Sequence, residues 1–230
     1  MLNAKNYRAT LILAIMATWV WAAVNPKFPD DWLLENYLVF IFVPFIILLG
    51  RYFRLSNVSY TLITVFMILH LIGSHYTYAE VPFGYTLQDW LGAERNMFDR
   101  LVHFSFGFLL AYPVREVFLR IAKVKGFWGY YLPFDVTLSL SAIYELIEWG
   151  TAAKVDPASA LAFLGSQGDI WDAQKDMLMA GVGALLTMFS IAIINVSFNK
   201  NFWKEMRQSF KIDNPDSALG EVKLMEYLDK

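Results

Sequence analysis

The chain has 230 residues, of which 57% are hydrophobic, 17% aromatic and 17% charged, and its formal net charge at pH 7 is −2. An average globular protein has about 25% charged residues, so this composition carries more apolar surface than one soluble domain can bury and indicates a membrane protein. Because the chain contains 0 Cys, disulfides and thiolate metal sites are excluded. No basic patch typical of nucleic-acid binding is present, so nucleic acid is not an expected partner.

Six apolar runs approach the length of about 20 residues that a helix needs to cross a bilayer. We therefore predict an all-α fold, a polytopic bundle of six transmembrane helices with the lipid bilayer as its main partner. The first run could instead be a cleaved signal peptide, but Trp19, Trp21 and the Asn25 and Pro26 exit favour a helix anchored at the interface. In chain order the runs are 9–24, 33–50, 55–74, 101–119, 132–152 and 177–196.

Lys and Arg are distributed unequally between alternate loops of this topology. One side holds 14 of the 19 and the other side holds 5. Positive residues accumulate on the cytoplasmic side of membrane proteins, so both termini are predicted to be cytoplasmic. Residues 1–197 would form the transmembrane domain. Residues 198–230 would begin with an amphipathic helix on the anionic inner leaflet and end in a polar, loosely ordered tail.

Ten ionisable residues lie at the edges of the apolar runs, all on the side opposite the predicted cytoplasmic one. A charged side chain near the bilayer core costs roughly 3 kcal/mol even on lenient scales, so such residues normally face a cavity or one another. They close the third and fifth runs and open the fourth and sixth, which predicts a shared outward-facing pocket. The ten are His70, His75, Asp99, Arg100, His103, Glu145, Glu148, Asp169, Asp172 and Asp176.

Helical spacing supports this convergence, since residues three, four or seven apart share one face. His70 and His75 are five apart and share a face poorly. His70, with Ser74 one turn on, is the one we expect to face the pocket. Ordinary capping or first-turn charge, worth about 1 kcal/mol each, is an alternative for Asp99 and for the first two Asp of the sixth helix. The sets on one face are Asp99 with His103, Glu145 with Glu148, and Asp169 with Asp172 and Asp176.

The carboxylates of this cluster outnumber the cationic side chains near them in sequence, which are Arg100 and Lys175. Their repulsion must be relieved by a bound cation, by proton uptake or by a structural polar network. Carboxylates with adjacent imidazoles suit zinc or manganese, and oxygen ligands alone suit magnesium, so we predict a divalent metal site. The predicted metal ligands are Asp169, Asp172, Asp176, His103 and Glu145; the predicted acid–base residues are His103, Glu145 and Glu148; and the predicted substrate or supporting residues are Asp99, Arg100, His70, His75 and Tyr78.

The segments 96–103, 144–149 and 168–177, together with His70 and the segment 73–80, resemble the bacterial YjdF family of inner-membrane proteins. The resemblance covers essentially the whole chain and implies a multi-pass protein of the bacterial inner membrane. Over the last three helices the chain is also similar to VanZ-like proteins, whose Asp-x-x-x-His helix start is matched by Asp99 and His103. Glu148 and Asp176 depart from the Gln and Asn of that pattern, and each departure adds a carboxylate.

Three functions from different classes fit these features. The first is a metal-dependent hydrolase or transferase acting on a lipid or lipid-linked head group at the outer leaflet. The second is a binding or transport protein for a cation or cationic amphiphile, and the third is an envelope-stress scaffold. Arg115 and Glu116, at the inner end of the fourth run, are more simply explained as a snorkelling side chain and a local ion pair than as a second site. The sequence leaves the oligomeric state open.

Overall fold

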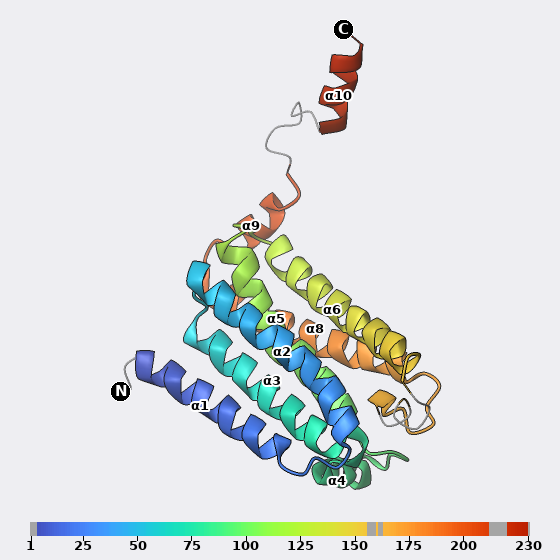
Figure 1. Cartoon of the computed structure of the whole chain (residues 1–230). Helices are drawn as coiled ribbons and strands as arrows, with labels where there is room; N and C mark the ends of the chain where they lie inside the picture. The colour runs from blue at the N-terminus through green and yellow to red at the C-terminus, as the bar shows by residue number, and fades with distance from the viewer. Residues whose placement is uncertain (1–3, 156–159, 161–162, 212–219, 230) are drawn as a thin grey trace.

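The structure is a computed structural model that describes residues 4–155, 160, 163–211 and 220–229. The regular secondary structure of this part of the chain is entirely helical. Long helices pack side by side, with the short helix α4 at one end of the bundle and α9 at the other (Figure 1). The elements are α1 (Ala4–Ala23), α2 (Pro29–Tyr52), α3 (Asn57–Tyr76), the 3-10 turn η1 (Tyr78–Glu80), α4 (Pro82–Leu91), α5 (Phe98–Arg120), α6 (Trp128–Ala152), α8 (Asp172–Phe198), α9 (Phe202–Gln208) and α10 (Gly220–Leu228).

Four helices, α2, α3, α5 and α8, are both long and apolar enough to cross a membrane. The helices α1 and α6 have 20 and 25 residues, and at about 1.5 Å per residue these lengths also match a hydrocarbon layer of about 30 Å. The helix α1 begins at Ala4, earlier than the predicted run, because polar residues that do not belong to the apolar run still continue the helix. In the predicted polar tail, the structure places the helix α10, while residues 212–219 lie outside the described residues.

The helix α5 is the centre of the bundle and packs against α3, α6 and α8. Its contact with α8 is close because glycines face the partner backbone. A Cβ atom at Gly107 would overlap the carbonyl oxygen of Ala180, and one at Gly183 would overlap that of Phe104. The Thr187 hydroxyl also donates a hydrogen bond of 2.5 Å to the carbonyl of Phe108. This close approach fixes the start of α5 beside the start of α8.

At the end of the bundle that holds α4, the loop before α5 is anchored by the buried amide of Asn96. The buried Asn96 side chain donates to the carbonyl of Val81 at 2.9 Å and accepts from the backbone N–H of Phe98 at 3.0 Å. Its own backbone N–H donates to Gln167 at 2.9 Å. These bonds hold the loop before α8 against the N-terminus of α5.

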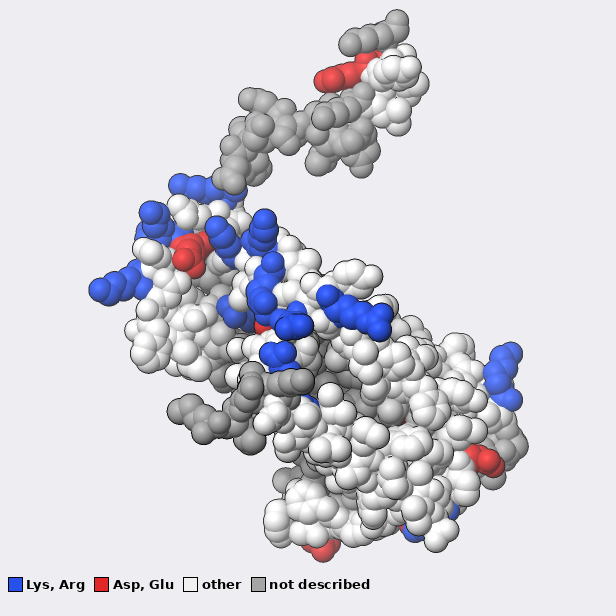
Figure 2. All heavy atoms as spheres, turned by 60° about the vertical axis from the view of Figure 1, so that its left-hand side comes forward, with Lys and Arg blue, Asp and Glu red and all other residues white. Residues whose placement is uncertain are grey.

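At the opposite end, the short helix α9 packs against the start of α6. The indole N–H of Trp128 donates to the carbonyl of Ser209 at 2.8 Å, and the rings of Phe202 and Tyr130 lie 6.2 Å apart. Lys and Arg side chains gather on the surface at this end of the molecule (Figure 2). The expected ion pair of Arg115 with Glu116 does not form, because adjacent residues point to different sides of α5 and Glu116 binds Ser56, Ser59 and Arg120 instead.

Candidate functional site

Three ionisable side chains from α5 and α8 converge at the α4 end of the bundle. Asp99, His103 and Asp176 are buried, and one ligand atom from each lies within 4.8 Å of the others. The Nε2 atom of His103 is 3.5 Å from Asp99 and 4.0 Å from Asp176, while its Nδ1 atom is 3.6 Å from Glu145 on α6. We call Asp99, His103, Glu145 and Asp176 the acidic–histidine cluster.

Two guanidinium groups bind the carboxylates beside this cluster. Arg100 forms ion pairs with Asp176 and, at 2.6 Å, with Asp172. Arg95 pairs with the same oxygen of Asp172 and, at 3.3 Å, with Asp99. Arg95 was not among the predicted site residues, although it lies only four residues before Asp99, in the loop that leads into α5. Arg95 therefore compensates part of the carboxylate excess that the sequence analysis found beside Arg100 and Lys175.

The predicted stripe of three Asp on one helix is wrong at its first member. The helix α8 begins at Asp172, and Asp169 lies in the preceding loop. Its carboxylate accepts hydrogen bonds from Lys175 at 2.7 Å and from the backbone N–H of Trp171 at 3.1 Å, and these bonds lower the pKa of Asp169 below its ordinary value. It also pairs with Arg100 at 3.2 Å. Asp169 therefore lies at the rim of the site, between the buried Arg100 and the exposed Lys175.

A cavity of about 420 Å³ opens beside the acidic–histidine cluster between α2, α3, α5 and α6. Most of its wall is apolar, and its ionisable groups come from the ends of helices that lie at the α4 end. Asp99 and His103 belong to both the cavity wall and the cluster, so the two features form one site. The polar lining comprises Glu35, His70, Tyr78, Asp99, His103, Ser141, Tyr144 and Glu148, and the apolar lining includes Leu38, Phe42, Phe66, Phe106 and Ile147.

The helix α2 contributes a carboxylate to this wall that the sequence analysis missed. Glu35 is buried, accepts a hydrogen bond of 3.2 Å from the Tyr144 hydroxyl, and lies 4.0 Å from the Nδ1 atom of His70. The same Nδ1 atom shares a hydrogen bond of 2.5 Å with the hydroxyl of Tyr78, whose pKa is raised by burial. The sequence does contain a feature that could have identified Glu35: it lies four residues after Asp31, near the start of a strongly apolar run.

The two predicted histidines at the end of α3 have different surroundings. His70 is buried and lines the cavity. The ring of His75 lies 4.4 Å from that of Trp21, and its Nδ1 atom is 3.1 Å from the carbonyl of Ala22. His75 therefore joins α3 to α1 outside the cavity.

Asp99, His103 and Asp176 form a buried group whose geometry could hold a metal ion. An oxygen of Glu145 and an oxygen of Asp176 are buried without a hydrogen-bond partner, and both face His103. Such carboxylate oxygens are stabilised by a cation or a proton. A donor set of carboxylates and one imidazole fits zinc or manganese. The structure groups Asp99 with His103 and Asp176, whereas the predicted ligands Asp169 and Asp172 are bound by arginine side chains.

Comparisons with known proteins match most of the chain. Residues 7–197 match the model of a family described as "Predicted membrane protein (DUF2238)". The inner membrane protein YjdF of Escherichia coli (strain K12) is 38% identical over 192 residues, which cover 83% of this chain and 88% of that protein. No solved structure matches. These matches, with the apolar helices, place the chain in the bacterial inner membrane.

Proposed function

We propose that this chain, which belongs to the DUF2238 family of membrane proteins, binds and chemically modifies the polar head of a lipid or lipid-linked molecule at the outer leaflet. The observation that carries the proposal is the cavity, because an apolar wall leads to a cluster of ionisable groups at one end of the bundle. An amphiphile has the same division between a long apolar part and a polar end. Its acyl chain would contact Phe42 and Ile147, and its head group would meet His103 and Glu148.

The proposed orientation has six spans, α1, α2, α3, α5, α6 and α8, with both termini in the cytoplasm. The gathering of Lys and Arg at the α9 end supports it, because positive residues favour the cytoplasmic side (Figure 2). A reporter that is active only in the cytoplasm, fused after Lys230, is expected to be active. Activity of a periplasm-specific reporter at the same position would contradict the orientation.

The proposed chemistry uses one divalent ion held by Asp99, His103 and Asp176. Without an added positive charge, the carboxylates of the cavity would repel the phosphate of a head group. A bound ion would supply that charge and polarise the phosphate, which makes hydrolysis or transfer easier. In this proposal Glu148, half-buried in the cavity wall, would take or give a proton, and Glu145, 3.6 Å from Nδ1 of His103, would orient the imidazole ring.

Metal content is the direct test of this chemistry. The protein purified under metal-replete conditions is expected to carry close to one zinc or manganese ion per chain by elemental analysis. Asp176→Asn should remove the ion, because it removes a buried ligand. Asp169→Asn is the matched control, since Asp169 is bound by Lys175 at the rim and should leave the metal content unchanged. Wild-type protein without metal would overturn the metal proposal.

A second candidate, binding of a cationic amphiphile, is favoured by the excess of carboxylates in the same cavity. Glu35, Asp99 and Glu148 all line it, and in the metal-free case they would attract a positive head group. Dodecyltrimethylammonium is a suitable probe, because it combines an alkyl chain with a fixed positive charge. Saturable binding to metal-free protein, weakened by Glu35→Gln, would favour this candidate over the metal-dependent enzyme.

A further inference from the structure

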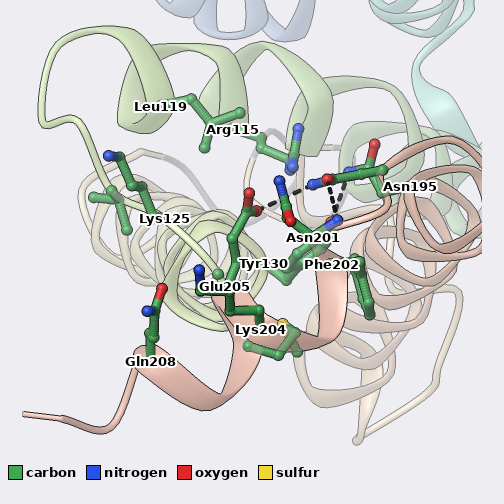
Figure 3. Close-up of a pocket in the computed structure, with 14 residues that line it drawn as sticks. Arg115, Leu119, Lys125, Tyr130, Asn195, Asn201, Phe202, Lys204, Glu205 and Gln208 are labelled. Atoms are coloured by element: carbon green, nitrogen blue, oxygen red, sulfur yellow. Dashed lines mark hydrogen bonds between the residues drawn. The ribbon is translucent and has the colours of Figure 1, made fainter.

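A second pocket, of about 480 Å³, lies at the opposite end of the bundle from the acidic–histidine cluster. It is enclosed by the end of α5, the loop before α6, the last turn of α8 and the helix α9 (Figure 3). Its charged lining residues are Arg115, Lys125, Lys204 and Glu205, so cations outnumber carboxylates three to one. The amide side chains of Asn195, Asn199, Asn201 and Gln208 complete its polar lining.

Arg115 is the central cation of this pocket. Its guanidinium lies over the ring of Tyr130, 4.8 Å from the ring centroid, and is half-buried. Its Nε atom is buried without a hydrogen-bond partner, and no ion pair joins Arg115 to a carboxylate among the described residues. The burial of this Nε donor is costly, because it has lost water without gaining an acceptor and no carboxylate compensates the charge.

The acids closest to Arg115 are engaged elsewhere. Glu116, its neighbour in sequence, accepts hydrogen bonds from Ser56 and Ser59 and pairs with Arg120. Glu205, in the pocket wall, accepts a hydrogen bond of 3.1 Å from the Asn199 side chain. The donors of Arg115 are therefore free for a ligand, and the two lysines add to its positive field.

We propose that this pocket binds a phosphate group, with Arg115 as the main contact and Lys125 and Lys204 as additional charges. Guanidinium binds phosphate through paired hydrogen bonds, and Lys binds it as a point charge. The phosphate could belong to an anionic lipid of the adjacent leaflet or to a soluble phosphorylated compound. Both sources share the same recognising chemistry, and the proposal is independent of the function proposed for the α4 end.

The test uses the full chain. In one arm, native mass spectrometry measures phosphatidylglycerol retained from nanodiscs, and in the other, inorganic phosphate is titrated into protein in dodecyl maltoside, a detergent without phosphate. Binding in either arm identifies the source of the phosphate. Arg115→Gln is expected to weaken that binding by about tenfold, the effect of removing one charged hydrogen-bonding group.

Arg207→Gln is the matched control, because Arg207 is an exposed arginine of α9 that does not line the pocket. It makes the same change in net charge and should alter binding by less than about twofold. If Arg115→Gln does not fold, Lys125→Gln replaces it, since Lys125 lies in an exposed loop. The proposal is overturned if neither arm shows binding, or if the pocket variants and the control lose binding equally.

Discussion

Arg95 links the helices α5 and α8 by ion pairs at the α4 end of the bundle. Its guanidinium contacts Asp172 on α8 and Asp99 on α5, and its side chain is 12% exposed. Without Arg95, Asp99 loses its nearest guanidinium, whereas Asp172 keeps its ion pair with Arg100 at 2.6 Å. Arg95→Gln is therefore expected to destabilise the protein by about 1–3 kcal/mol and lower its Tm by several degrees in a detergent thermal-unfolding assay.

Lys27 offers a matched comparison for that measurement. It pairs with Glu80 at the same end of the molecule, but the two side chains are 46% and 37% exposed. Exposed ion pairs contribute about 0 to 1 kcal/mol, so Lys27→Gln should change the Tm little. Equal losses in both variants would show that the Arg95 network is no more important than a surface pair.

The rim pair of Asp169 with Lys175 gives a prediction about pH. The pKa of Asp169 is lowered in the folded protein, so the pair contributes above the ordinary pKa of 3.8 and is lost only as pH falls through the lowered value. The effect of Lys175→Gln on the Tm should therefore be the same at pH 8 and pH 5. A clear decrease of that effect at pH 5 would show that the pKa of Asp169 is raised above its ordinary value instead of lowered.

At the scale of helices, the contact of α5 with α8 depends on the absence of side chains at two glycines. Gly107→Ala is expected to lower the Tm, because its Cβ would overlap the backbone of Ala180 and overpacking costs about 1–3 kcal/mol. Gly150→Ala on α6 is the control. Its Cβ would meet nothing within 4 Å, and alanine favours helix by up to about 1 kcal/mol. A Gly107→Ala protein as stable as the control would contradict the close packing.

The positions of the long helices could be predicted from the sequence, because apolar runs of about 20 residues mark them directly. The pairing of His103 with the Asp99 carboxylate on the same helix was also predictable, since the two residues are one turn apart. Glu35 and Arg95 were missed for a different reason. Their roles depend on which helices pack together, and neither hydropathy nor helical spacing states that α2 borders the same cavity as α6.

At the scale of the whole molecule, the acidic site and the basic pocket described above lie at opposite ends of the bundle, and the orientation of that axis can be measured without first removing native cysteines. The chain has 0 Cys, so single cysteines can be introduced at exposed positions. Glu94→Cys, at the α4 end, should react in intact cells with a maleimide that crosses only the outer membrane. Arg207→Cys, at the α9 end, should react only after the inner membrane is opened, and the reverse pattern would reverse the orientation.

The glycine contact between α5 and α8 also limits where the protein can move. Because the two backbones touch at Gly107 and Gly183, we expect these helices to shift as one unit and to keep the spacing of Asp99 and Asp176. In α2, only 17% of the residues of the apolar window are buried, and its one glycine, Gly50, touches no neighbouring backbone. We therefore expect a bulky molecule to enter the cavity by displacing α2 and not by separating α5 from α8, so that the proposed metal ligands Asp99 and Asp176 keep their spacing.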